Sequence, residues 1–324
     1  MNSINKEIKI LSPINQPYLY GYDKYFDFFI KLCEKNEMPN CILLSGPKGL
    51  GKSTFAFHMA NYILSKNEEN RYSIGDYNIH QNNSSYRLVN LNIHPNFFLI
   101  ENKMFEKDIK IDQIRDLLRF LNKSTYSKDI RIIMIDNSEN LNLNSSNALL
   151  KSIEEPQNNT FFFIIHNSSC TILETIKSRC TEFKFTFSSK EKKNIFKDIV
   201  HQYEESLEIN EVIDDYYFES PGNLIKYFLP LYMNNIKVAG NTLECIYYFI
   251  DKYKNAKDPE TLSFLSLFIE KFYKELCSSD IKNLNSYFYN QSKILKYIND
   301  MKKFNLDKKN VLIYIKDILQ NETK

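Results

Sequence analysis

A glycine-rich segment constrains this sequence more than any other feature. Gly46-Pro47-Lys48-Gly49-Leu50-Gly51-Lys52-Ser53 matches the pattern G-x-x-x-x-G-K-[ST] at every fixed position. It follows the short apolar run 41–44 and precedes a helical pattern over 55–64, which is the context that a phosphate-binding loop requires. Three of the chain's seven glycines lie within it, so composition does not explain the match. A glycine turn without a ligand is the alternative interpretation.

The chemistry expected of such a loop is phosphate binding. Successive backbone N–H groups turn inward around a phosphate, and the N-terminus of the following helix adds partial positive charge. Lys52 is expected to reach the β- and γ-phosphates, and the Ser53 hydroxyl is expected to hold Mg²⁺. We therefore expect ATP or ADP with Mg²⁺ to bind through Gly46, Pro47, Gly49, Gly51, Lys52, Ser53 and Thr54.

A second part of the nucleotide site follows another apolar run, 131–135. Asp136 ends this run, where its carboxylate would join Ser53 at the Mg²⁺ ion. Hydrolysis also requires a base for the attacking water, but the next residue is Asn137, whose amide cannot take a proton at neutral pH. Glu139 is either a substitute base or a solvated carboxylate at a helix start. The sequence therefore predicts a site that binds nucleotide better than it hydrolyses it.

The alternation of apolar runs and helical patterns predicts an α/β fold with a mainly parallel sheet. Continuous apolar runs at 41–44, 131–135 and 161–165 are typical of strands that helices cover on both faces. Helices are expected over 55–64, 111–121 and 144–155, and the polar stretch 65–92 is expected to be a surface excursion. After Phe187 the strand patterns stop. We expect an α/β nucleotide-binding domain over 1–186, a small helical lid over 187–235 and an all-helical C-terminal domain over 236–324.

Composition excludes several classes of protein. No segment approaches the roughly 18 apolar residues of a membrane span, and residues 1–16 lack the apolar core of a signal peptide, so we expect a cytoplasmic protein. The formal net charge of +2 does not indicate a dedicated nucleic-acid binder. The six cysteines form no C-x-x-C pair, so no zinc site is expected.

Several ordered stretches carry a family resemblance. Residues 146–156 resemble an N-A-L-L-K-x-L-E-E-P helix, and residues 175–180 resemble a T-I-R-S-R-C segment. Residues 94–96 are similar to an H-P-D turn that precedes a strand. Residues 111–115 are similar to an I-x-V-D-Q-I-R segment. Residues 20–21 are similar to a hydrophobic-Gly pair at an adenine site. Over residues 17–186 the chain resembles the AAA+ clamp-loader family, and within it the delta-prime subunits of bacterial DNA polymerase III.

The resemblance implies roles for two further residues. Asn167 would be the sensor-1 residue near the γ-phosphate, although a turn asparagine at a strand end is the alternative. Arg179 would be an arginine finger that acts in trans on the ATP of an adjacent motor subunit, whereas an isolated arginine is usually a surface ion-pair residue. Asn223 stands where the family's sensor-2 arginine is expected. No cysteine lies between Lys66 and His94, where many members carry a zinc insert.

Three functions remain as hypotheses. The leading one is a clamp-loader subunit in DNA replication, which would work with gamma/tau and delta subunits to load a sliding clamp on primed DNA, and whose C-terminal domain would form an oligomerising collar. The second is an active gamma/tau-like ATPase motor with Glu139 as its base. The third is a single-stranded DNA binder that stacks bases on its many Tyr and Phe residues. The near-neutral charge and the helical spacing of the C-terminal aromatic residues argue against the third.

Overall fold

A computed structural model describes residues 10–102, 108–123, 130–203, 216, 219–236, 238, 240–256, 259–280, 282–304 and 308–322. These residues fall into two compact units. The first runs as far as residue 203 and includes residues 219–225. The second comprises residue 216 and the chain from residue 226 onward. Each unit is described separately below, and the expected boundaries at 186 and 235 stay predictions.

A five-stranded parallel sheet forms the centre of the first unit. Its strands lie in the order β2-β3-β4-β1-β5. Their bounds are β1 Cys41–Gly46, β2 Phe97–Ile100, β3 Arg131–Ile135, β4 Thr160–Asn167 and β5 Thr181–Lys184. The strand that leads into the glycine-rich segment, β1, therefore lies between β4 and β5. All carboxyl ends of the strands meet at one edge, which is where ligands bind in sheets of this type.

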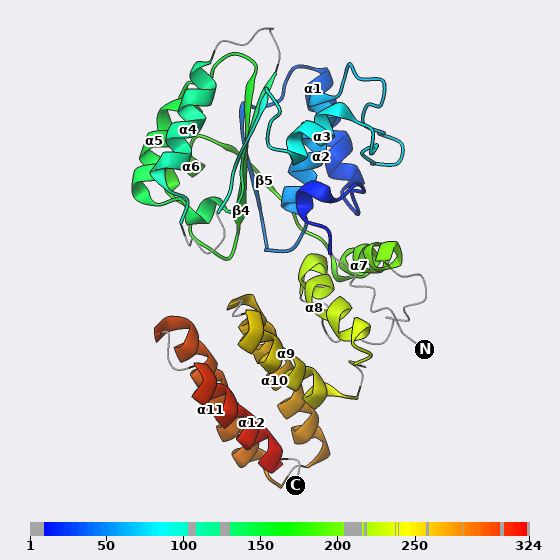
Figure 1. Cartoon of the computed structure of the whole chain (residues 1–324), viewed down its shortest axis with the longest axis vertical. Helices are drawn as coiled ribbons and strands as arrows, with labels where there is room; N and C mark the ends of the chain where they lie inside the picture. Colours follow the sequence, from blue (N-terminus) through cyan, green and yellow to red (C-terminus); the bar gives the residue numbers. More distant parts are fainter. Residues whose placement is uncertain are drawn as a thin grey trace. The chain divides into compact units, whose positions relative to one another are not determined.

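Helices cover both faces of this sheet (Figure 1). On one side lie α1, α2 and α3, and on the other lie α4, α5 and α6. Alternate strand residues point into two separate cores, because side chains of a strand alternate between its faces. Ile42 and Leu44 pack toward α1 and α2, whereas Leu43 packs toward α4 and α5. The helix bounds are α1 Asp23–Glu34, α2 Lys52–Leu64, α3 Ser84–Asn90, α4 Ile111–Asn122, α5 Leu143–Glu154 and α6 Glu174–Lys177.

The predicted α/β class is confirmed, and so are the predicted core elements. The runs at 41–44, 131–135 and 161–165 lie in β1, β3 and β4, and the three expected helices correspond to α2, α4 and α5. The stretch 65–92 differs from a plain surface excursion. It contains α3, and it buries Tyr72 and Ile79 against the core formed with α1 and α2.

The described residues of the first unit also form two short 3-10 helices, the helix α7 and the start of α8. The 3-10 helices are η1 Pro13–Asn15 and η2 Ser138–Asn140, and the α-helices are α7 Ser189–Tyr203 and the start of α8 Pro221–Met233.

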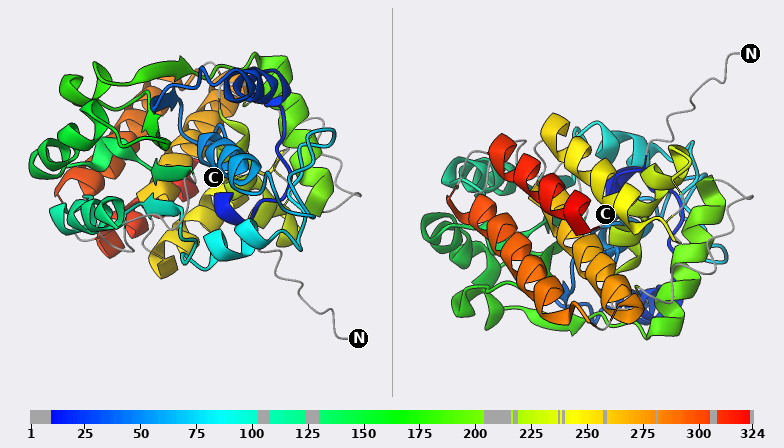
Figure 2. Two further views of the ribbon diagram at one scale, coloured as in Figure 1. Left: turned by 90° about the horizontal axis from the view of Figure 1, so that it is seen from above. Right: turned by 90° about the horizontal axis from the view of Figure 1, so that it is seen from below.

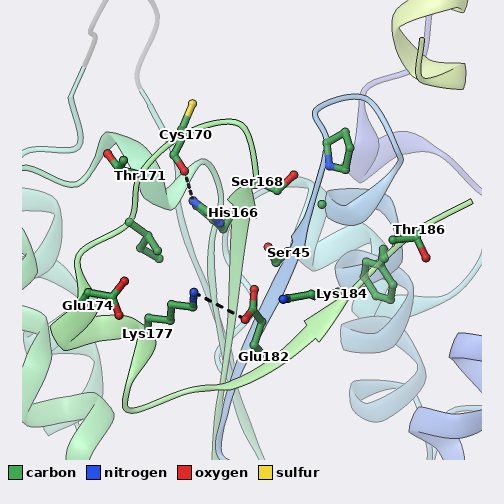
Figure 3. Close-up of a pocket in the computed structure, with 14 residues that line it drawn as sticks. Ser45, His166, Ser168, Cys170, Thr171, Glu174, Lys177, Glu182, Lys184 and Thr186 are labelled. Atoms are coloured by element: carbon green, nitrogen blue, oxygen red, sulfur yellow. Dashed lines mark hydrogen bonds and ion pairs between the residues drawn. The ribbon is translucent and has the colours of Figure 1, made fainter. Parts of the chain in front are cut away.

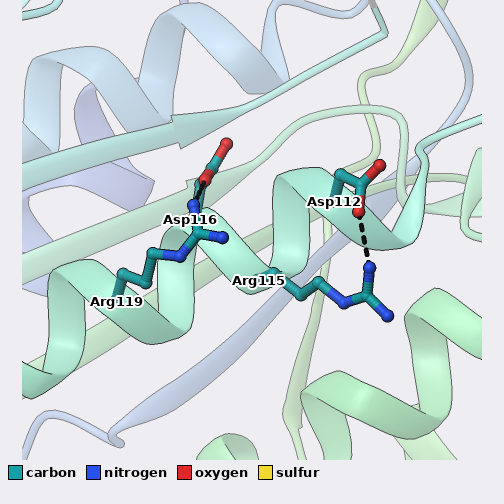
Figure 4. A network of polar contacts seen from close by, with 4 residues as sticks. All are labelled: Asp112, Arg115, Asp116 and Arg119. Atoms are coloured by element: carbon teal, nitrogen blue, oxygen red, sulfur yellow. Dashed lines mark hydrogen bonds and ion pairs between the residues drawn. The ribbon is translucent and has the colours of Figure 1, made fainter.

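On the exposed face of α4, Asp112 pairs with Arg115 over 2.8 Å and Asp116 pairs with Arg119 over 2.7 Å (Figure 4). Exposed pairs of this kind contribute little to stability.

In the described residues of the second unit, all regular secondary structure is helical. After the remainder of α8 it consists of α9 Thr242–Ala256, α10 Pro259–Ser279, α11 Leu284–Phe304 and α12 Lys308–Glu322. Consecutive helices of this set pack together, and α12 also packs on α9 (Figure 2). The faces predicted from helical spacing are buried, as Phe268, Ile298 and Ile315 illustrate with no exposed surface. Within the described ranges, no helix is long and apolar enough to cross a membrane.

Candidate functional site

The glycine-rich segment forms a loop between the end of β1 and the start of α2. Gly49 and Gly51 have φ angles of 80° and 90°, in the left-handed region that favours glycine. Gly51 is also the N-cap of α2, so the first turn of a 13-residue helix opens directly from the loop. This geometry leaves the N-terminal amides of α2 facing the loop, which is the arrangement that binds anions.

Lys52 places a buried ammonium group inside this loop. Its side chain is only 6% exposed, and its Nζ donates hydrogen bonds to the carbonyl oxygens of Gly46 and Pro47 over 2.8 and 2.7 Å. Burial lowers the pKa of Lys52 to about 8, although the carboxylates of Glu139 and Asp136 favour the charged form. The hydrogen-bond partners of this ammonium group are carbonyl oxygens, which carry only partial negative charge. A phosphate in the loop would give it a fully charged anionic partner.

Ser53 and Asp136 meet beside the loop. The Ser53 Oγ lies 2.9 Å from both carboxylate oxygens of Asp136, which directly follows β3. Burial raises the pKa of Asp136, and its hydrogen bond with Ser53 opposes this shift. A hydroxyl and a carboxylate held this close are suitable oxygen ligands for one Mg²⁺ ion. Thr54, the next residue of α2, is half-buried.

The position after Asp136 carries no carboxylate, but Glu139 lies nearby. Asn137 has a φ angle of 55° and begins the turn into η2. This turn brings the Glu139 carboxylate to the end of β4, where it accepts a hydrogen bond from the backbone N–H of Asn167 over 3.1 Å. Glu139 is half-buried and lies in the first turn of η2, so both interpretations, a substitute base and a helix-start carboxylate, stay open. Its direction could not be inferred from the sequence, because it depends on the left-handed Asn137.

Asn167 lies beside the loop, since the strand register pairs it with Gly46. Its side chain is bonded within its own turn: Oδ1 accepts from the Ser169 N–H over 3.1 Å, and Nδ2 lies 3.5 Å from the Cys170 Sγ. The resemblance places sensor 1 here, and that role stays a prediction. Contact with a γ-phosphate would require the amide to leave this turn.

The start of α8 packs directly on the loop. The backbone N–H of Gly222 donates to the Gly49 carbonyl over 2.9 Å, and a Cβ built on Gly222 would lie 2.6 Å from that oxygen. A Cβ on Gly49 would lie 2.2 Å from the Ser220 Oγ. Asn223 donates to Glu219 over 3.2 Å and brings no cation toward the loop. Sequence reasoning missed this contact, because a single Ser-Pro-Gly gives no indication of its partner.

The expected adenine side of the site is closed by α7. Gly21 has a φ angle of 73°, and a Cβ there would lie 2.3 Å from the Ile195 side chain. Burial raises the pKa of Tyr20 to about 12, and its hydroxyl donates to the Gln202 side chain over 3.2 Å. A further contact that sequence reasoning missed is Tyr22, whose buried hydroxyl donates to the Leu50 carbonyl over 3.0 Å and ties α1 to the loop.

An open pocket of about 440 Å³ lies next to the first part of the loop (Figure 3). It is bordered by the ends of β1 and β5, the turn after β4, and α6. His166 contacts the Cys170 carbonyl over 3.2 Å, and burial lowers the His166 pKa. Lys177 and Glu182 lie 4.0 Å apart across the pocket floor. The pocket lining also includes Glu174 and Lys184, so its two carboxylates are matched by two ammonium groups.

Arg179 lies apart from these groups, in the turn between α6 and β5. Its Nε is 3.2 Å from a carboxylate oxygen of Glu154, the last residue of α5, and its Nη1 donates to the Thr175 carbonyl over 3.0 Å. Its side chain is 32% exposed. The structure thus brings Gly46 to Ser53, Asp136 and Asn167 together and gives Arg179 partners outside the loop. The role of Arg179 in another subunit stays a prediction.

A metal site apart from Ser53 and Asp136 would need its own group of metal-binding side chains. In the described ranges, no cluster of three or more His, Cys, Asp or Glu side chains could hold a metal ion. The expected absence of zinc stays a prediction. All six cysteines are free thiols.

The parallel sheet, the strand order and the phosphate loop define a P-loop α/β domain of the AAA+ class, followed by a helical region. The chain belongs to the family described as DNA polymerase III, delta subunit, whose model matches residues 21–189, more than half of the 324 residues. The predicted membership in the clamp-loader family is therefore confirmed.

Three curated relatives illustrate the similarity. The DNA polymerase III subunit delta-prime of Pseudomonas aeruginosa is 34% identical over 140 residues, covering 43% of this chain and 41% of the relative. The delta-prime subunit of Haemophilus influenzae is 28% identical over 152 residues, covering 47% and 44%. The DNA polymerase III subunit gamma of Buchnera aphidicola is 30% identical over 141 residues, covering 41% and 38%. The matches span less than half the length of each relative.

Proposed function

We propose that this chain is a clamp-loader subunit in DNA replication that binds nucleotide without hydrolysing it and supplies Arg179 to a neighbour's ATP. The observation that carries the proposal is the pairing of a complete phosphate loop with Asn137 at the position of the base. Its partners would be gamma/tau and delta subunits. The sliding clamp and primed DNA would be reached through the complex, in the bacterial cytoplasm.

The nucleotide-binding part of the proposal depends on three side chains. The Lys52 ammonium group is buried among carbonyl oxygens, and Ser53 and Asp136 are hydrogen-bonded at the mouth of the loop. ATP or ADP would place its β-phosphate among the N–H groups at the start of α2. Its Mg²⁺ would be held by Ser53 and Asp136. Thr54 follows Ser53 in α2, and Asn167 is paired with Gly46 in the sheet register, so both could complete the site.

The in-trans part depends on the position of Arg179. Its guanidinium is partly exposed and is held by Glu154 and Thr175, away from the loop residues that surround Lys52. A planar, permanently charged fork suits stabilisation of charge spread over phosphate oxygens. To act on a neighbour's ATP, the Arg179 guanidinium would leave the Glu154 carboxylate and bind the phosphate oxygens instead.

Calorimetry and a phosphate-release assay on the isolated chain test the first part. We expect Mg-ADP and Mg-ATP to bind to the wild type and to lose binding in Lys52→Ala, while phosphate release stays near background. Lys48→Ala, an exposed change in the same loop, is the matched control. A wild-type turnover within tenfold of ordinary AAA+ motors would contradict the proposal, and so would failure of both nucleotides to bind.

A second candidate function, an active gamma/tau-like motor, is favoured by the position of Glu139. Its carboxylate lies beside the end of β4 and acts electrostatically on Lys52, so it is within the site. If Glu139 were a base, wild-type turnover would be measurable and Glu139→Gln would remove it. Under the leading proposal, Glu139→Gln leaves the background rate unchanged.

A further inference from the structure

Two thiols lie in contact at the amino ends of neighbouring strands. Cys41 is the first residue of β1, and Cys180 directly precedes β5. The parallel register pairs Ile42 with Thr181, so Cys41 and Cys180 are the preceding pair on adjacent strands. Strands of a sheet lie about 4.8 Å apart, which is within the Cα separation that a disulfide spans. The strand register therefore places the two residues at a separation that a disulfide can span.

The side chains of the two cysteines point to the same face of the sheet. Both belong to the core beneath α4 and α5, where Cys41 is 5% exposed and Cys180 is half-buried at the margin. Their Sγ atoms lie 2.9 Å apart. Nonbonded carbon atoms prefer separations of about 3.5–4.0 Å, so this contact is closer than ordinary core packing.

The environments of the two thiols give them different chemical roles. The hydrogen bond with Cys180 and burial both raise the pKa of Cys41, which keeps Cys41 a protonated thiol. Cys180 lies nearer to solvent and is the sulfur that a small oxidant can reach first. Cys41 is then positioned as the second, resolving thiol.

We propose that Cys41 and Cys180 form a reversible intramolecular disulfide when the chain meets a peroxide. The Cys180 thiolate attacks one peroxide oxygen, the O–O bond breaks, and the departing hydroxide takes up the proton that Cys180 released. The Cys41 sulfur then attacks the Cys180 sulfenic acid, and the hydroxyl leaves as water with the Cys41 proton. The two sulfurs are oxidised, hydrogen peroxide is reduced, and two waters form. A dithiol reductant reverses the step by exchange.

The bond would fix the segment that carries Arg179. Arg179 directly precedes Cys180, its backbone N–H donates to the Ile176 carbonyl, and its guanidinium donates to the Thr175 carbonyl of α6. A covalent link from Cys180 to the central strand β1 would restrict the movement by which Arg179 leaves Glu154. This consequence rests on the proposed function, whereas formation of the bond does not.

Peroxide treatment of the full chain, followed by alkylation and peptide mapping, tests the bond. We expect a linked peptide pair containing Cys41 and Cys180, a mass lower by two hydrogen atoms, a higher thermal midpoint, and reversal by dithiothreitol. Cys180→Ser and Cys41→Ala should each abolish the link. Cys170→Ser, which removes an exposed thiol, should preserve it. If Cys41→Ala fails to fold, the wild-type map and Cys180→Ser decide the matter.

Other oxidation products would overturn the inference. Sulfinic or sulfonic acid at Cys180 beside an unmodified Cys41 would show that the pair does not close, as would a link to Cys170 instead. In a reconstituted loader, oxidation should lower stimulated ATP hydrolysis several-fold in the wild type and leave Cys180→Ser unaffected. Unchanged hydrolysis despite a mapped disulfide would remove the effect on Arg179 alone, and the Arg179→Ala variant separately tests the proposed function.

Discussion

The backbone N–H of Gly222, in the first turn of α8, donates a hydrogen bond to the carbonyl oxygen of Gly49 in the phosphate loop over 2.9 Å. A Cβ on either residue would lie within 3.0 Å of the other segment, so close approach is possible only for this pair of glycines. The contact joins the start of α8 to the loop that would hold nucleotide. A change in the loop would therefore act directly on the first turn of α8.

Gly222→Ala should loosen this contact. Its Cβ would lie 2.6 Å from a backbone oxygen, which cannot move aside as a flexible side chain can. Overpacking of this kind costs about 1–3 kcal/mol. We expect a lower thermal midpoint and weaker nucleotide binding. Gly75→Ala is the control, because nothing lies within 4 Å of a Cβ at Gly75. Equal midpoints for the two variants would contradict the close approach.

Lys52→Met should stabilise the nucleotide-free chain. Burial lowers the Lys52 pKa to about 8, which means that the folded state disfavours this charge. The Gly46 carbonyl would keep its bond from the Ser168 N–H, and Pro47 is exposed to water. We expect a gain of about 1–3 kcal/mol at pH 7 from relief of this cost. Urea unfolding measures the gain, with Lys48→Met as the matched control.

The same Lys52→Met variant should lose the stabilisation that Mg-ADP gives to the wild type. This second readout separates a binding residue from a merely strained one, because a ligand stabilises only the state that binds it. A variant that is less stable than the wild type, or that still responds to Mg-ADP, would contradict the role of Lys52.

His58 makes the fold sensitive to acid. Its ring contacts the Tyr72 hydroxyl over 2.9 Å and the Gln16 carbonyl over 3.0 Å, and burial lowers its pKa from 6.5 to about 4. The neutral ring contributes stability that is fully present above pH 6.5. This contribution is lost as the pH falls to 4, because the unfolded chain then binds a proton that the folded chain does not. The loss amounts to roughly 3 kcal/mol.

Unfolding free energies between pH 7 and pH 4 check this slope. His58→Gln should be less stable at pH 7 and should show a flatter profile, since the titrating group is gone. His80→Gln, at an exposed position, should keep the wild-type profile. A wild-type slope that survives in His58→Gln would assign the acid sensitivity to other groups.

Much of the fold could be predicted because its central strands are buried on both faces. Such strands appear as continuous apolar runs, so β1, β3 and β4 were predicted from the sequence pattern alone. The residues Thr181–Lys184 of β5 gave no such signal. This strand is short, lies at the sheet edge, and is only partly buried, with both of its end residues exposed. Its place beside β1 depends on tertiary pairing that local sequence does not encode.

The candidate site was predicted where a motif fixes local geometry and missed where distant segments meet. The spacing of Gly46 to Ser53 determines the loop, and the strand end determines Asp136. The direction of Glu139 depends on the positive φ of Asn137, and the approach of Gly222 depends on how α8 returns to the loop. These contacts are set by packing between segments that lie far apart in the sequence.

Arg179 in a reconstituted clamp loader gives the most direct test of the central claim. Arginine fingers contribute about 10³–10⁵ in rate at a single site, but one finger among several sites should change the ensemble rate several-fold. We expect Arg179→Ala to fold, to bind nucleotide as the wild type does, and to lower clamp- and DNA-stimulated ATP hydrolysis by that amount. Arg179→Lys should restore little, because an ammonium group lacks the bidentate fork.

Two matched variants make the measurement specific. Arg115→Ala, which removes an exposed ion-paired arginine from α4, should leave stimulated hydrolysis unchanged. Glu154→Gln, which removes the carboxylate partner of Arg179, should maintain or increase it. We predict that stimulated hydrolysis falls several-fold in Arg179→Ala alone among these three variants. Hydrolysis and clamp loading at wild-type rates with Arg179→Ala would contradict the in-trans role and leave Arg179 as an ordinary ion-pair residue.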